Sequence, residues 1–307
     1  MRIVVMGSGG LGGYFGGLLA QSGADVTFVA RGAHLQALQE RGLTVRSVNG
    51  DFTVPVQACL DPRALPPAGM VFFCVKTYDA AEAAALLQPV VDAQTIVLTL
   101  QNGVDTAADL QTTFGRGTVL AGVTRMGSTL VGPGVIEQPT SDRLIEFGSL
   151  TGREQEQVER VHTLCTTAGI PTLVSPNIRC SLWEKLVFIA PFSGLSTLTH
   201  LTPAQFLAHE PTRGLYRAVT QETAAVAQAA AGVTPDIVER TMHYLDTAGD
   251  PGESSMAVDF RRQRRIEVDA INGAVVRHGQ RLRVPTPLNQ MIYHALVVMD
   301  HYNRQTA

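Results

Sequence analysis

The pattern of apolar and polar positions divides the chain at about residue 176. Before that point, short apolar and β-branched runs alternate with stretches of helical periodicity. This alternation is typical of a doubly wound α/β sheet. We expect a helix over residues 11–22. The expected strands are residues 2–6, 25–30, 43–48, 52–56, 70–75, 95–100, 118–123, 144–147 and 172–174.

After residue 176 strand-like runs almost disappear and helical periodicity repeats. Pro- and Gly-rich breaks separate several of these segments, for example residues 249–255 (GDPGESS). We therefore predict a Rossmann-type α/β domain over 1–176, followed by an all-helical domain over 177–307. The expected helices of the second domain are residues 177–190, 211–231, 235–247, 255–278 and 286–302.

The composition narrows the class of protein. The 307 residues are 45% hydrophobic and 17% charged, with a net charge of −3, which is ordinary for a globular protein and argues against nucleic acid as a partner. The arginines at 261, 262, 264 and 265 are flanked by acidic residues and are read as a solvated helix face.

No apolar run is long enough to span a membrane, and the N-terminal run is too short for a signal peptide. The four cysteines are scattered without the spacing of a metal site or a disulfide framework. We therefore expect a cytoplasmic protein without a bound metal. The apolar run over 296–299 fits either a homodimer interface or the core.

A glycine-rich motif follows the first expected strand and opens the first expected helix. This context is what a dinucleotide-binding loop requires, because the helix N-terminus then faces a pyrophosphate. The alternative is a glycine-rich turn that binds nothing. The six residues of this G-x-G-x-x-G are Gly7, Ser8, Gly9, Gly10, Leu11 and Gly12.

The residue after the second expected strand indicates which cofactor is used. An acidic residue there would bind the ribose 2′-hydroxyl of NAD and repel a 2′-phosphate. This chain has Arg31 instead, a fixed cation that can hold phosphate, so we expect NADP(H). The alternative for Arg31 is an ordinary surface arginine.

Polar side chains end two further strands, and one lysine lies in an apolar helical stretch. Lys76 and Asn102 follow the expected strands 70–75 and 95–100, at the sheet edge where α/β proteins bind ligands. Lys185 lies in RCSLWEKLVF, where the common alternative is a lysine that extends to the surface. Ser255 is expected near a helix start, with Glu267 about three turns further on.

Together these residues resemble the ketopantoate reductase (2-dehydropantoate 2-reductase) family, over essentially the whole chain. The matching motifs occur in the same order and at matching spacing. They are the glycine motif, Arg31, V-K at 75–76, Q-N-G at 101–103, L-W-E-K-L at 182–186, S-S-M at 254–256 and E-V-D-A-I-N-G at 267–273.

The resemblance implies NADPH-dependent reduction of a 2-oxo acid to a 2-hydroxy acid, in pantothenate biosynthesis if the acid is ketopantoate. Lys185 would be the general acid, which suits a ketone oxygen that gains negative charge. Glu267 would support Lys185 and contact the cofactor. The resemblance also implies cofactor contacts from Lys76, Asn102 and Ser128, and substrate contacts from Asn102, Lys185, Ser193 and Ser255.

The chain departs from the family where the resemblance predicts asparagines that hold the substrate. Ile189, Ser193 and Pro203 occupy those positions, and Pro191 is expected to kink or end the helix. Two alternatives to ketopantoate reduction therefore remain. One is the same reaction on a more apolar 2-oxo acid, and the other is an NADP-binding sensor without catalysis.

Overall fold

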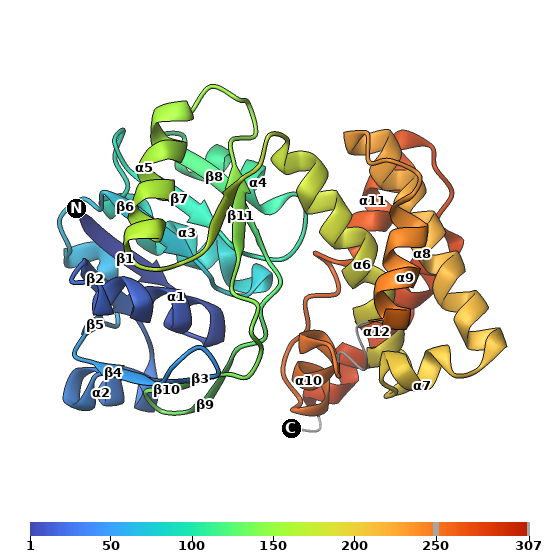
Figure 1. Cartoon of the computed structure of the whole chain (residues 1–307), viewed down its shortest axis with the longest axis horizontal. Helices are drawn as coiled ribbons and strands as arrows, with labels where there is room; N and C mark the ends of the chain where they lie inside the picture. The colour runs from blue at the N-terminus through green and yellow to red at the C-terminus, as the bar shows by residue number, and fades with distance from the viewer. Residues whose placement is uncertain (248–251, 306–307) are drawn as a thin grey trace. The chain divides into compact units, whose positions relative to one another are not determined.

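The computed structural model describes residues 1–247 and 252–305, so part of the predicted break at 249–255 lies outside the described residues. The chain forms two compact units (Figure 1). The first contains residues 1–101 and 106–178, and the second contains residues 102–105 and 179–307. The sequence pattern placed the change at 176/177 and gave no sign that residues 102–105 group with the second unit.

The first unit is built on an eight-stranded sheet in the order β12-β11-β8-β7-β6-β1-β2-β5. The six strands from β8 to β5 in this order run parallel, whereas β11 is antiparallel to β8. The bounds are β1 Arg2–Met6, β2 Asp25–Val29, β5 Gln57–Cys59, β6 Met70–Phe73, β7 Ile96–Thr99, β8 Thr118–Thr124, β11 Ile145–Gly148 and β12 Thr172–Val174.

The central strands are apolar on both faces because helices cover the sheet on both sides. The residues of β6 and β7 are all buried. The helices of this unit are α1 Gly10–Gln21, α2 Gly32–Arg41, α3 Ala80–Leu87, α4 Thr106–Phe114 and α5 Gln155–Thr167, with short 3₁₀ turns η1 Pro62–Ala64, η2 Thr77–Asp79 and η3 Gln88–Val90.

A smaller four-stranded sheet, β4-β3-β10-β9, packs on the outer side of α1. Its contact is close, since a Cβ on Gly13 would come within 2.7 Å of the Ile136 side chain. Strands β5, β9 and β10 were not predicted, because each has only three or four residues and none is a continuous apolar run. The bounds are β3 Leu43–Ser47, β4 Phe52–Val54, β9 Thr129–Gly132 and β10 Val135–Gln138.

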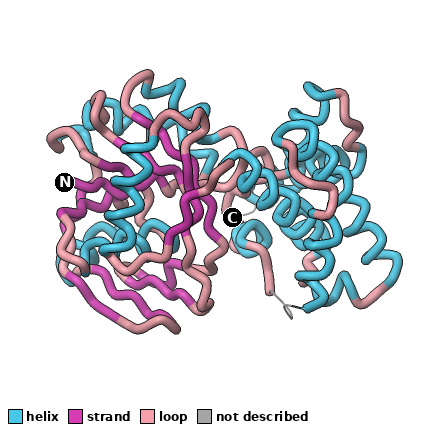
Figure 2. Tube along the Cα trace, turned by 45° about the horizontal axis from the view of Figure 1, so that its top comes forward, coloured by secondary structure: helices cyan, strands magenta, loops and turns pink. Residues whose placement is uncertain are grey.

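The second unit is helical, and in its described residues Figure 2 shows no strand. Its own apolar core includes Trp183, Val187, Tyr216, Val275 and Leu296. The predicted α/β class with a helical C-terminal part is therefore confirmed. The helices are α6 Ile178–Thr199, α7 Pro203–Leu207, α8 Glu210–Ala231, α9 Ile237–Thr247, α10 Ser255–Arg261, α11 Asn272–Leu282 and α12 Pro287–Gln305.

Helix α6 does not end before Pro191, as the sequence had suggested, but continues to Thr199. Ala190 and Ser193 near the proline are buried, so packing maintains the helix although one backbone N–H is missing. Asn272 Nδ2 also donates a hydrogen bond to the Ala190 carbonyl, at 3.1 Å. Tertiary contacts thus override the local effect of the proline.

The expected helix 255–278 is wrong as one element. It is two helices, α10 and α11, joined by an irregular segment over 262–271. Gln263 adopts a left-handed φ of 54° there, and the Asp300 side chain accepts a hydrogen bond from the Ile266 N–H at 3.2 Å. Glu267 therefore lies on an irregular segment, and of the four clustered arginines only Arg261 is helical.

No helix among the described residues is long and apolar enough to cross a membrane. Within the same residues, no group of three or more His, Cys, Asp or Glu side chains could hold a metal ion. None of the four cysteines forms a disulfide bond, and burial raises the pKa of the Cys74 and Cys165 thiols to about 12.

Candidate functional site

The glycine motif forms a close-packed loop between β1 and α1. Gly7 has φ 99°, and a Cβ there would lie 2.7 Å from the Val75 nitrogen at the end of β6. A Cβ on Gly12 would overlap the Gly7 carbonyl oxygen. At Gly9, in contrast, a Cβ would meet nothing within 4 Å, so the backbone here is open to a ligand. The loop is thus tightly packed against the protein at Gly7 and Gly12 and open at Gly9.

This open space lies at the N-terminus of α1, next to the point where the strand order reverses. Strand β1 lies between β2 and β6, so the chain crosses over the sheet here. The first-turn N–H groups of a helix have no partner within the helix and attract anions. The residues present therefore fit a dinucleotide pyrophosphate.

Two serines predicted at the cofactor have different surroundings. The Ser8 side chain is 5% exposed and donates a hydrogen bond to the Val29 carbonyl at 3.2 Å, so any cofactor contact would come from its backbone. Ser128 is half-buried, and a Cβ on Gly10 would overlap its carbonyl group. The Ser128 backbone therefore lies against the first turn of α1.

Arg31 lies just before α2, and its side chain is 77% exposed. Its guanidinium forms a loose ion pair with Asp79 on η2, with 3.7 Å between the nearest atoms. Exposed pairs of this kind contribute little to stability. Arg31 is therefore available to an anion, and Asp79 is a neighbour that sequence reasoning did not identify.

His34 is a second residue that the sequence pattern missed. Its Nδ1 accepts a hydrogen bond from the Gly134 N–H at 3.0 Å, so Nε2 carries the proton and donates to the Ser8 carbonyl at 2.9 Å. Burial lowers the pKa of His34, although the bond to Ser8 opposes this effect. This neutral imidazole joins α2, the glycine loop and the turn between β9 and β10. In the sequence, only its position three residues after Arg31 could have indicated that His34 lies near the glycine loop.

The carboxyl ends of β6 and β7 are tied together by Gln101. Its Nε2 donates a hydrogen bond to the Val75 carbonyl at 2.9 Å, and the residue is 6% exposed. Lys76, the next residue after Val75, is half-buried at the start of η2. Lys76 therefore lies at the same strand ends as the glycine loop.

The helical unit brings together residues that are far apart in the sequence. Asn102 Nδ2 donates to Glu267 Oε2 at 3.4 Å, across 165 residues of chain. Glu267 is 6% exposed. Lys185 lies half-buried on α6, and its neighbour in the chain, Leu186, is buried.

Lys76 and Lys185 are the only lysines in the sequence, among 24 basic residues. The chain uses arginine at every other cationic position. Lysine differs from arginine because its ammonium can release a proton at accessible pH. Both positions that retain lysine are predicted site residues.

The positions where asparagines were expected are apolar or buried. Ile189 lies one turn after Lys185 and packs partly against the helical core. Ser193 is 4% exposed. Pro203 is buried at the first position of α7, after a capping box formed by Thr202 and Gln205, so this position serves to start a helix.

The two serines at the start of α10 also differ. Ser254 caps the helix by accepting a hydrogen bond from the Ala257 N–H at 3.1 Å, and it lies 3.1 Å from the Ser196 hydroxyl. Ser255, the predicted substrate contact, is exposed in the first turn. This arrangement leaves Ser255 accessible to a ligand.

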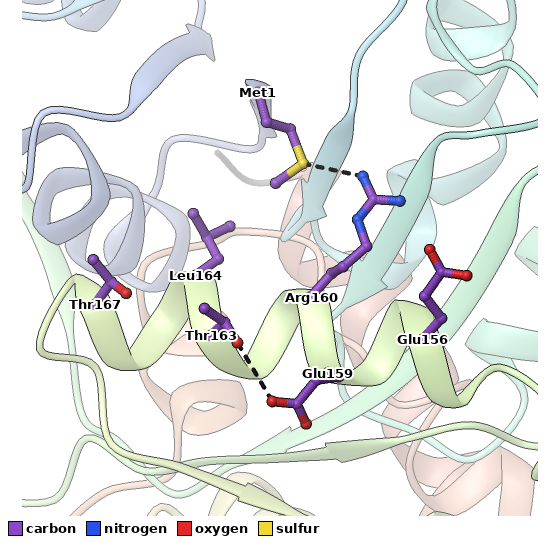
Figure 3. Close-up of a pocket in the computed structure, with 7 residues that line it drawn as sticks. All are labelled: Met1, Glu156, Glu159, Arg160, Thr163, Leu164 and Thr167. Carbon is purple, nitrogen blue, oxygen red and sulfur yellow. Dashed lines mark hydrogen bonds between the residues drawn. The ribbon is translucent and has the colours of Figure 1, made fainter.

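A shallow groove of about 570 Å³ lies elsewhere, between Met1 and α5 (Figure 3). It is at the amino end of β1, whereas the glycine loop is at its carboxyl end. Its lining contains none of the predicted site residues. The lining residues are Met1, Glu156, Glu159, Arg160, Thr163, Leu164 and Thr167.

Comparison with known proteins covers the chain almost from end to end. Residues 3–152 match the family model of ketopantoate reductase PanE/ApbA, and residues 177–300 match the model of its C-terminal part. A crystal structure of a PanE/ApbA family ketopantoate reductase from Ralstonia eutropha JMP134 is 31% identical, with a TM-score of 0.90, and covers 99% of this chain and 100% of that one.

Two curated relatives agree with this result. A 2-dehydropantoate 2-reductase of Halobacterium salinarum is 31% identical over 291 residues, covering 94% of this chain and 95% of the relative. Another from Nostoc sp. is 29% identical over 314 residues, covering 99% and 96%. The chain therefore belongs to the ketopantoate reductase family, and it is an oxidoreductase that acts on a CH–OH group.

Proposed function

We propose that this protein reduces 2-dehydropantoate to pantoate with NADPH, in pantothenate biosynthesis. The observation that carries the proposal is the placement of the two lysines within a chain of this family. One follows β6 beside the glycine loop, and the other lies half-buried in α6. The curated relatives named 2-dehydropantoate 2-reductase support the choice of substrate.

The first unit would hold the cofactor. The N-terminus of α1 and the open backbone at Gly9 would bind the pyrophosphate, and Arg31 would bind the 2′-phosphate through charge-assisted hydrogen bonds. Lys76, Ser128, Asn102 and Glu267 would add further cofactor contacts. NADPH supplies the hydride that adds to the carbonyl carbon of the substrate.

The second unit would stabilise the negative charge on the substrate oxygen and supply the proton. The Lys185 ammonium stabilises the negative charge that develops on the substrate oxygen, and its proton is transferred to that oxygen to complete the hydroxyl group. The lysine is left neutral and regains a proton from solvent. Glu267 would support the lysine, and Ser255 and Ser193 would contact the substrate.

Ile189 favours a second candidate substrate. An isoleucine cannot hydrogen-bond the hydroxyl group of ketopantoate, and an unpaired hydroxyl costs about 1–3 kcal/mol. A more apolar 2-oxo acid, such as 2-oxo-3-methylbutanoate, would meet no such cost. A site of this kind rejects an added hydroxyl only weakly, so both acids would be turned over.

One experiment tests these alternatives and the sensor hypothesis together. NADPH oxidation is followed with a panel of 2-oxo acids that includes ketopantoate and 2-oxo-3-methylbutanoate. We expect turnover with at least one of them, and the ratio of kcat/KM values identifies the preferred substrate. NADPH binding without oxidation in the presence of any acid would instead support a sensor.

A further inference from the structure

Residues 102–105 form a short loop that is attached to the helical unit at every position. The Asn102 amide donates to Glu267, and Val104 packs against the helical core. Gly103 has φ 100°, and a Cβ there would lie 3.0 Å from the Ala270 carbonyl oxygen. Asp105 ends the loop with a hydrogen bond to His278 on α11. The loop thus carries one predicted site residue and three anchors.

The Asp105 anchor is the shortest and the most elaborate. Its Oδ1 lies 2.6 Å from His278 Nε2, and Arg281 Nη2 lies 2.8 Å from His278 Nδ1. A guanidinium can only donate, so Nδ1 accepts and the imidazole proton lies on Nε2, directed at Asp105. His278 is 9% exposed, and its ring meets the edge of Trp183 with centroids 5.0 Å apart.

Charge around Asp105 strengthens this anchor. Arg277 Nη2 lies 3.7 Å from its second carboxylate oxygen. Burial alone raises the pKa of Asp105, but the hydrogen bond from His278 and the charges of Arg277 and Arg281 outweigh it and lower that pKa. Asp105 is therefore a carboxylate that receives both a hydrogen bond and positive charge from α11.

The hydrogen bond between the predicted site residues Asn102 and Glu267 is much weaker than the bond between Asp105 and His278. The donor–acceptor distance from Asn102 to Glu267 is 3.4 Å, near the outer limit for a hydrogen bond. A bond of this length does not hold a loop in place by itself. The position of the Asn102 amide therefore depends on the other contacts of the loop, of which the bond between Asp105 and His278 is the shortest.

We propose that Asp105 and His278 are positioning residues that hold Asn102 against Glu267 through the loop 102–105. The inference rests on the proposed function, in which Asn102 and Glu267 belong to the reductase site. Neither Asp105 nor His278 needs to touch the substrate. Small displacements of site residues can lower turnover by up to about a hundredfold, so the anchor has a measurable effect on rate.

The test is a double-mutant cycle between the anchor and the residue it positions. Asp105→Ala and Asn102→Ala are each expected to lower kcat by about tenfold or more, and the double variant is expected to be no slower than Asn102→Ala alone. Asp105→Asn retains an oxygen that can accept from His278 and is expected to recover part of the rate. Independent effects that multiply in the double variant would overturn the proposal.

A matched control removes a carboxylate elsewhere in the same unit. Asp246 on α9 pairs with Arg213 on α8 at 2.6 Å. Asp246→Ala is expected to retain the turnover of the unmodified protein. A loss in Asp246→Ala as large as that in Asp105→Ala would show a general effect on the helical unit and would count against positioning.

Hydrogen exchange of the backbone amides supplies a measurement that does not depend on turnover. Exchange over residues 102–105 is expected to accelerate in Asp105→Ala and His278→Gln, but not in Asp246→Ala. If the unmodified protein reduces none of the 2-oxo acids, the proposed function fails, whereas faster exchange confined to this loop still supports the anchor. Unchanged exchange in both variants would overturn it.

Discussion

The two units of this protein build their candidate sites in different ways. In the first, one short run of residues shapes the glycine loop, and its close contacts come from the adjacent strand ends and from Ser128. In the second, Asn102 meets Glu267 across 165 residues of chain, and we propose that Lys185, from a third segment, belongs to the same site. The first site depends on backbone shape, whereas the second depends on side chains that packing brings together.

Because the two sites are built differently, we expect that substitutions can impair one site without impairing the other. Substitutions around the glycine loop should change cofactor affinity, since we propose that backbone N–H groups and the Arg31 guanidinium bind phosphate there. Substitutions in the helical unit should change turnover or substrate preference. The predictions below test that separation, starting with the largest expected effect.

Lys185→Ala should lower kcat by about a hundredfold or more, because the proton donor is lost, and should leave the Kd for NADPH nearly unchanged. The measurements are steady-state turnover and fluorescence titration with NADPH. Lys185→Arg is the matched variant, since it keeps a positive charge but cannot release a proton at accessible pH. It should be nearly as slow as Lys185→Ala.

An Arg variant with the unmodified rate would show that charge alone suffices, and the proposed proton transfer would be wrong. The sequence offers a further check, because it contains only two lysines. Labelling of the lysine side chains for NMR therefore yields two side-chain signals. The one lost in Lys185→Ala reports the protonation of Lys185 directly.

Arg31→Ala should weaken NADPH binding by roughly ten- to a hundredfold, because a charge-assisted contact to the 2′-phosphate is worth about 1.5–3 kcal/mol. Binding of NADH should change little. The Kd for each cofactor is measured by titration, with Arg41→Ala as a control at the opposite end of α2. Equal losses for NADPH and NADH would contradict a 2′-phosphate contact.

Ile189→Asn should shift the ratio of kcat/KM values toward ketopantoate by about tenfold, since the amide can pair with the substrate hydroxyl. Both acids are compared in the unmodified protein and in the variant. Cofactor affinity should stay the same. An unmodified protein selective for ketopantoate, made worse by the asparagine, would show that the site is built around Ile189.

His34 should make stability depend weakly on pH. Its pKa is lowered in the folded protein from 6.5, so the unfolded chain binds the proton more readily. The contribution of His34 to the free energy of unfolding is then fully present above pH 6.5. It decreases as the pH falls toward the pKa of His34 in the folded protein. Thermal unfolding at several pH values measures this, and His34→Gln should flatten the dependence. A decrease of the same size in the variant would assign it to other groups.

Much of the first unit could be predicted because its determinants are local. The strands over 2–6, 70–73 and 96–99 are continuous apolar runs, which identify buried parallel strands without knowledge of their neighbours. The glycine loop was recognisable for the same reason. Strands β5 and β10 were missed because their few residues pair with β2 and β3, which are distant in the chain, and β9 pairs only with β10.

The helical unit shows where local information ends. The sequence by itself determined the helical class and the main helices, and Lys185 and Glu267 are site residues predicted from it. Only the tertiary structure decided that α6 continues through Pro191, that the stretch 255–278 breaks into two helices, and that residues 102–105 join this unit. The physical reason is the same in each case. Burial of neighbouring apolar side chains and hydrogen bonds with distant residues, such as Asn272, Asp300 and His278, outweigh the preferences of the local chain.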